Sequence, residues 1–141
     1  RTAVPGAEGN FRSALVKELR ALGVFVQPIE SGTTASGIPD IYLAFEWGYS
    51  CWVELKAMQG VSWPAARKVL FHPGQRAWLS RHARTGNHSF VTVRYANAVV
   101  TQGVADIDAE TDRMDMTKPM LIQPKRDAKE WLEWLAQAMT T

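Results

Sequence analysis

The sequence predicts a mixed α/β fold, formed as a single domain over residues 1–141. Its length supports this prediction, because 141 residues at 15.7 kDa is an ordinary size for one domain. Its composition, with 46% hydrophobic and 21% charged residues, is globular and excludes a disordered or collagen-like chain. The apolar pattern also alternates between helical and strand periods along residues 8–95. The one cysteine, Cys51, excludes an internal disulfide.

The first elements are a helix over residues 8–22 and a short strand over residues 24–26. Gly23 follows the helix, at the position where a C-terminal glycine is favoured, and Pro28 closes the strand. The helix has one apolar stripe, with members three or four residues apart, formed by Phe11, Leu15, Leu19 and Leu22.

The central part of the chain alternates strands with one helix. We expect two strands joined by a turn, then a helix, then a fourth strand, over residues 41–45, 51–55, 75–83 and 90–95. Small polar residues make 31–37 a loop, and the glycines and prolines of 57–74 exclude a long regular element there. The predicted core is therefore αβββαβ, with a mixed central sheet flanked by helices.

The C-terminal extension, residues 96–141, carries no further strand in this prediction. Residues 106–126 are acidic, then basic, and contain two prolines, which is typical of a surface excursion. A final helix is expected over residues 128–139, with an apolar side that includes Trp131 and Leu135. Trp131 and Trp134 pack on the core in this prediction, and a homodimer contact there is the alternative.

Charge is distributed unevenly along the chain. Residues 1–54 contain four Lys or Arg against six Asp or Glu, and residues 106–141 contain five against eight. Residues 55–105 contain seven basic residues and no acidic one, so the net charge of +2 conceals a positive block. Such a block suits a polyanion such as nucleic acid, although chance segregation on a solvated surface explains the charge pattern equally well.

Two carboxylates and a lysine converge in the predicted hairpin. If Phe45 lies opposite Cys51, then Asp40 lies opposite Lys56 and Tyr42 lies opposite Glu54, all on one face. The apolar face then contains Ile41, Leu43, Phe45, Cys51, Val53 and Leu55. Mg²⁺ prefers such hard oxygen ligands and can activate a water for phosphodiester hydrolysis, while a lysine can position or deprotonate that water. A structural alternative is a turn aspartate beside an exposed Glu–Lys pair.

The motif Pro39-Asp40 followed by Glu54-Leu55-Lys56 resembles that of the PD-(D/E)XK nuclease superfamily, whose fold is restriction-endonuclease-like. With Gln75 opening the later helix, the pattern is most similar to stand-alone VRR-NUC domains and to archaeal Holliday junction resolvases. The resemblance covers roughly residues 8–95.

The resemblance implies a role for each matching residue. Asp40 and Glu54 would bind the metal with the Leu55 carbonyl, and Lys56 would be the catalytic lysine. Glu8 matches the additional acid of the first helix, and we prefer it to Glu18, which lies deeper in that helix. Gln75 matches a glutamine that contacts water, lysine or phosphate; an ordinary helix-start glutamine is the alternative.

The resemblance also gives the basic block a function in binding DNA phosphates. The expected DNA contacts are Arg12, Ser31, Arg67, Lys68 and Arg76. Trp63 could stack on an unpaired base, and packing beneath its own loop is an equally good interpretation.

The sequence thus predicts a DNA endonuclease that uses Mg²⁺, with Mn²⁺ as a substitute, and that selects branched DNA such as four-way junctions. The alternatives are a restriction- or repair-type nuclease on duplex DNA and a non-catalytic nucleic-acid-binding module of the same fold. No apolar run is long enough to cross a bilayer and no targeting segment is evident, so a cytoplasmic protein is expected.

Overall fold

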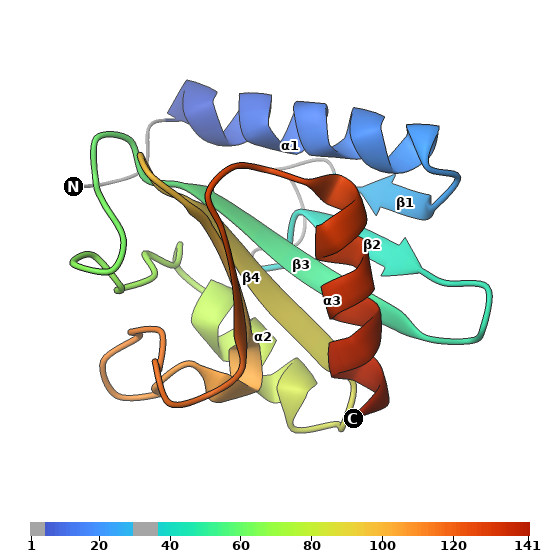
Figure 1. Ribbon diagram of the computed structural model, residues 1–141. Coiled ribbons are helices and arrows are strands. Elements are labelled where there is room, and N and C mark those ends of the chain that lie inside the picture. Colours follow the sequence, from blue (N-terminus) through green and yellow to red (C-terminus); the bar gives the residue numbers. More distant parts are fainter. Residues whose placement is uncertain (1–4, 30–36) are drawn as a thin grey trace.

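The computed structural model describes residues 5–29 and 37–141, with the backbone alone for residues 5–8 (Figure 1). Its elements are α1 (Pro5–Ala21), β1 (Phe25–Pro28), β2 (Ile41–Ala44), β3 (Ser50–Ala57), α2 (Gln75–Ala83), β4 (His88–Arg94), β5 (Val99–Gly103), the 3₁₀ turn η1 (Val104–Asp106), β6 (Met120–Gln123) and α3 (Ala128–Thr140). The strands form one six-stranded sheet in the order β1 to β6. Only β3 and β4 pair in parallel, so the predicted mixed sheet flanked by helices is confirmed.

Each face of the sheet is covered by its own hydrophobic core. The first core joins the sheet to α1 and α3, through buried residues such as Leu15, Val53 and Leu135. The second joins the other face to α2 and the irregular segments, through residues such as Leu79 and Val91. The side-chain alternation of β4 makes this division possible, because Phe90 belongs to the first core and Val91 to the second. Within the described ranges, no helix is long and apolar enough to cross a membrane.

The C-terminal end of α1 follows the glycine-capped pattern that the sequence predicts. Gly23 has a φ of 79°, and its N–H donates to the Arg20 carbonyl at 3.0 Å. The Val24 N–H donates to the Leu19 carbonyl at 3.1 Å, which completes a Schellman motif. Leu22 is 48% exposed and does not belong to the apolar stripe as predicted, because it lies in this turn. Val16 is buried on the helix instead.

The predicted register of the β2–β3 hairpin is wrong by two residues. Leu43, rather than Phe45, lies opposite Cys51, and Tyr42 lies opposite Trp52. The turn is tighter than expected because Gly48 adopts a φ of 91°, which lets the Phe45 N–H reach the Tyr49 carbonyl at 2.8 Å. A shift of two residues keeps every side chain on its face. The predicted apolar face is therefore confirmed: its members lie in, or pack against, the first core.

The C-terminal extension adds two strands that the sequence analysis did not predict. β5 pairs with β4, and β6, from the segment predicted as a surface excursion, pairs with β5. Buried polar side chains hold these strands in place. The Gln102 amide exchanges hydrogen bonds with the backbone of Asp115, and the Trp131 indole donates to the hydroxyls of Thr92 and Thr101 at 3.0 and 3.1 Å. The predicted helix over residues 128–139 is confirmed as α3.

Candidate active site

Asp40 lies immediately before β2, at the edge where the β2–β3 ladder ends. The last pair of that ladder is Ile41 with Val53, so one further step places Asp40 beside Glu54 rather than opposite Lys56 as predicted. Its carboxylate Oδ2 accepts a hydrogen bond from the Leu55 N–H at 2.9 Å. Its Oδ1 lies 3.5 Å from the guanidinium Nη1 of Arg12, on α1. Asp40 is thus attached to the central strand on one side and approached by α1 on the other.

Glu54 and Lys56 point together from β3 and meet the first residue of α2. The Lys56 ammonium lies 3.3 Å from Glu54 Oε2, and both side chains are almost completely buried. Gln75 joins them, because its Oε1 accepts from Lys56 Nζ at 2.9 Å and its Nε2 donates to Glu54 Oε2 at 2.8 Å. The His72 N–H also donates to Gln75 Oε1, at 2.8 Å. Gln75 therefore fixes the positions of a carboxylate and an ammonium at once.

The electrostatics of Glu54 are unusual for a carboxyl group. Its pKa is raised from 4.5 to about 8, mainly by burial and secondly by the nearby charge of Asp40. Lys56 and the Gln75 hydrogen bond act in the opposite direction. The second oxygen, Oε1, is buried and has no hydrogen-bond partner in the described part of the chain. Such an orphaned carboxylate oxygen costs free energy unless another group neutralises it.

The backbone of Leu55 adds a further oxygen at the same place. In a strand, the N–H and C=O of one residue point toward the same neighbouring strand. The Leu55 N–H points to Asp40, beyond the end of the β2 ladder. The Leu55 carbonyl therefore points to the side of Asp40, beyond the last described pair of the β2–β3 ladder, Ile41 with Val53.

These donors fit a hard divalent cation. The free Oε1 of Glu54, the carboxylate of Asp40 and a backbone carbonyl are all oxygen ligands of the kind that Mg²⁺ and Mn²⁺ take. Among the described residues, no group of three or more His, Cys, Asp and Glu side chains gathers for a metal. Glu8, the predicted third acid, has its side chain outside the described residues, so its role as a ligand stays a prediction.

The rival acid of α1, Glu18, lies elsewhere. Its two carboxylate oxygens accept hydrogen bonds from the Arg126 guanidinium at 2.9 and 3.1 Å, just before α3. This pair ties the C-terminal half of α1 to the C-terminal extension. Glu18 therefore stabilises the packing of two segments and takes no part in the candidate site.

The residues predicted to contact DNA differ in their exposure and in whether other protein groups already bind their side chains. Lys68 is exposed, and Arg12 lies at the site itself. Arg76 is held within the protein: its Nε pairs with Asp112 at 3.0 Å and its Nη2 donates to the Ile107 carbonyl at 3.2 Å. Arg67 is half-buried, and its Nε has no hydrogen-bond partner in the described ranges. Ser31 lies outside the described residues.

Trp63 packs under its own loop, which is one of the two interpretations that the sequence allowed. It is 8% exposed and its ring lies 5.5 Å from that of Tyr95, in the second core. Its backbone N–H and carbonyl both pair with the side chain of Asn97. The indole is therefore not available to stack on a base.

A row of aromatic side chains beside the site was not anticipated. Tyr42 packs on Trp52 with centroids 5.1 Å apart, and Trp52 packs edge-on against Trp78 of α2 at 5.6 Å. The row connects β2, β3 and α2 on the face that carries Glu54. The corrected register would have revealed it, because Tyr42 and Trp52 are direct cross-strand partners.

Comparison with known proteins gives a match at the level of the fold. No protein-family profile matches the sequence, and no curated protein matches it. Among solved structures, the chain is similar to the 1.6 Å structure of Hjc, a Holliday junction resolvase from the archaeal hyperthermophile Archaeoglobus fulgidus. The TM-score is 0.53 at 16% sequence identity, and the match covers 77% of this chain and 88% of that one. The predicted fold class is thereby confirmed.

Proposed function

We propose that this protein is a metal-dependent endonuclease that hydrolyses phosphodiester bonds in DNA, and that it selects branched DNA such as four-way junctions. The observation that carries the proposal is the buried Glu54, with one oxygen held by Lys56 and Gln75 and the other without a hydrogen-bond partner among the described residues. A carboxylate in this state, next to a second carboxylate, is suited to a divalent cation.

Asp40, Glu54 and the Leu55 carbonyl would hold Mg²⁺ or Mn²⁺, with Glu8 as a further ligand. Such a cation lowers the pKa of a water and neutralises charge on a phosphate.

The protein's own residues place the reacting groups. The Lys56 ammonium, held by Gln75 Oε1, can orient a water for attack on the phosphorus and stabilise the charge that develops there. Gln75 keeps Lys56 and Glu54 in fixed relative positions, so the site is organised before a substrate enters.

The preference for branched DNA is supported by the shared fold with a protein described as a Holliday junction resolvase. Restriction- or repair-type cleavage of duplex DNA is the alternative. We expect faster cleavage of a four-way junction than of a linear duplex of equal length. Equal rates would refute the preference for junctions and leave the nuclease proposal standing.

The nuclease proposal is tested with Asp40→Asn and Lys56→Met. Both variants nearly preserve side-chain size, so the loss of a metal ligand or of an ammonium is isolated from a cavity. We expect each to reduce Mg²⁺-dependent cleavage about a hundredfold or more. The measurement is single-turnover cleavage of labelled DNA, with circular dichroism to check the fold.

Glu46→Gln and Lys118→Met serve as matched controls, because both residues are exposed and lie outside the candidate site. They should cleave like the wild type. Full activity in both Asp40→Asn and Lys56→Met would show that the site lies elsewhere. Metal binding without cleavage of any DNA would favour the non-catalytic binding module.

A further inference from the structure

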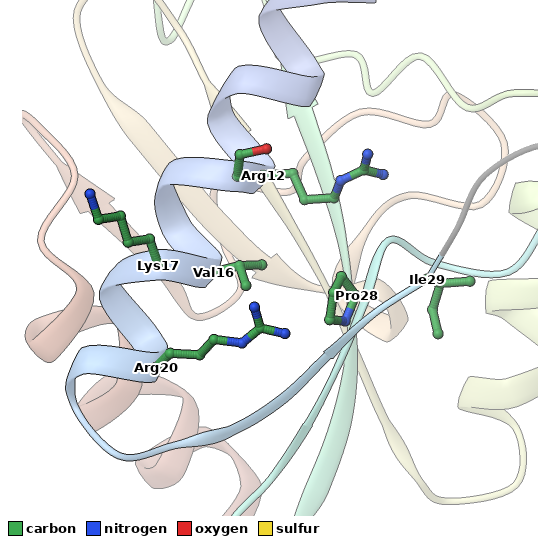
Figure 2. A pocket seen from close by; sticks show the side chains of 7 residues that line it. Arg12, Val16, Lys17, Arg20, Pro28 and Ile29 are labelled. Atoms are coloured by element: carbon green, nitrogen blue, oxygen red, sulfur yellow. The ribbon is translucent and has the colours of Figure 1, made fainter.

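A pocket of about 430 Å³ lies between α1 and the end of β1. Figure 2 shows Arg12 and Arg20 reaching from α1 toward Pro28 and Ile29, while Lys17 extends from the other side of the helix. Val16, Pro28 and Ile29 provide apolar surface, and Ser13 adds a hydroxyl. The pocket is therefore an apolar hollow with cationic groups around it.

The described side chains that line this pocket carry a net positive charge. Among the described residues that line the pocket, three of seven are basic and none is acidic. Glu18, the nearest acid along the helix, is engaged with Arg126. No ion pair involves Lys17 or Arg20 within the described ranges. Arg12 pairs with Asp40, so Arg20 is the cation on the Pro28 side of α1 that has no ion pair in the described ranges, and an unneutralised cation attracts an anion.

The pocket is continuous with the candidate active site through Arg12. This side chain lines the pocket and also lies 3.5 Å from the carboxylate of Asp40. Arg12 and Arg20 are eight residues apart, two turns along one helix face, which is about 12 Å along the axis. Because one DNA strand rises about 3.4 Å per nucleotide, this spacing along the helix axis corresponds to about three to four nucleotides.

We propose that the pocket lined by Arg12 and Arg20 binds backbone phosphates of the DNA strand that runs away from the cleaved linkage along α1. This inference rests on the proposed function and extends it to a binding subsite. Arginine suits this role, because its planar guanidinium donates two parallel hydrogen bonds to a phosphate. The contact reads no base, so it acts on any sequence.

The test is DNA binding by Arg20→Gln, measured by fluorescence anisotropy without divalent metal, so that no cleavage occurs. The Arg20 side chain is exposed. The substitution keeps the Arg20 backbone carbonyl, which accepts the Gly23 N–H at the end of α1. We expect an affinity about three- to tenfold weaker for junction and duplex alike, and a salt slope reduced by about one. Lys118→Gln is the matched control for loss of one exposed positive charge and should bind as the wild type does. Arg20→Lys should recover part of the affinity.

The outcomes separate the two proposals. If Arg20→Gln binds DNA as tightly as Lys118→Gln, the phosphate subsite is refuted, whatever the nuclease assay shows. If a deoxynucleoside monophosphate raises the melting temperature of the wild type but not of Arg20→Gln, while DNA affinity is unchanged, the pocket takes free nucleotides and the proposal is overturned. If the wild type binds DNA and cuts none, the nuclease proposal fails and the subsite is still judged by the affinities. If the wild type binds no DNA, both fail.

Discussion

At the scale of single residues, Glu54 combines burial, a neighbouring ammonium and an oxygen that has no hydrogen-bond partner in the described ranges. Burial raises its pKa to about 8 in the folded protein, against an ordinary 4.5, so in the metal-free fold the carboxyl retains a proton to higher pH than it does in the unfolded chain. In the unfolded chain the same group is ionised above its ordinary pKa. Folding therefore takes up a proton between these two values, and the protonated acid favours the folded state.

This raised pKa predicts how stability depends on pH. The contribution of Glu54 is fully present below pH 4.5 and is lost as pH rises toward 8, because the unfolded state binds fewer protons there. Between these values, this group lowers the free energy of unfolding by about 1.4 kcal/mol per pH unit. Urea unfolding of the metal-free protein at several pH values measures the slope.

Glu54→Gln is the comparison variant, because an amide keeps the shape of the carboxyl and does not titrate. The difference in unfolding free energy between wild type and variant should change steadily from pH 5 to pH 8. A constant difference over this range would show that Glu54 titrates normally in the fold. Glu46→Gln, at an exposed position, should show no such trend.

At the scale of elements, the site depends on how closely the segment before β2 approaches the start of α2. Gly37 has a φ of 95°, and a Cβ added there would lie 2.6 Å from the Gly74 carbonyl oxygen and 3.2 Å from Trp78 Cβ. Gly74 is the N-cap of α2, directly before Gln75. The Gly37–Gly74 contact thus aligns the segment carrying Asp40 with the helix carrying Gln75.

We expect Gly37→Ala to destabilise the protein by about 2 kcal/mol or more, because the new methyl group meets backbone at a strained φ. Cleavage should also fall, since the segment before Asp40 must shift. Gly48→Ala is the matched control: its φ is 91°, but nothing lies within 4 Å of the added Cβ. Thermal unfolding of both variants separates steric overlap from backbone strain. Equal destabilisation would argue against the close contact.

At the scale of the whole molecule, the C-terminal extension completes the fold and changes its charge distribution. Asp112 pairs with Arg76, and its carbonyl accepts from the Val69 N–H at 2.8 Å. The acidic segment therefore lies against part of the positive block that the sequence shows. Trp131 and Leu135 of α3, in turn, cover the sheet face opposite α2.

We predict that a chain ending at residue 119, which lacks β6 and α3, does not fold cooperatively. The deletion removes Ala128, Trp131, Leu135 and Met139 from the first core and exposes the apolar sheet face beneath them. Near-ultraviolet circular dichroism and urea unfolding measure the loss. Arg126→Gln, which removes only the half-exposed pair with Glu18, should change the free energy of unfolding by about 1 kcal/mol or less. A truncated chain that unfolds like the full one would refute this role for α3.

The sequence by itself determined the features that depend on short-range periodicity. The bounds of α2, the glycine cap of α1 and the two faces of the β2–β3 hairpin follow from neighbouring residues, and so they could be predicted. The cluster of Asp40, Glu54 and Lys56 also followed, because a register error of two residues preserves the face. Their roles in metal binding and catalysis stay predictions.

Only the tertiary structure decided the remaining features. The hairpin register depended on a tight turn at Gly48. The formation of β5 and β6 depended on pairing between segments whose local sequence patterns are weak. The two contacts of Gln75, the neutralisation of Arg76 by Asp112 and the pocket beside Arg20 join residues far apart in the chain. The physical reason is that local periodicity fixes which way a side chain faces, whereas its burial and its charge partners depend on the packing of the complete fold.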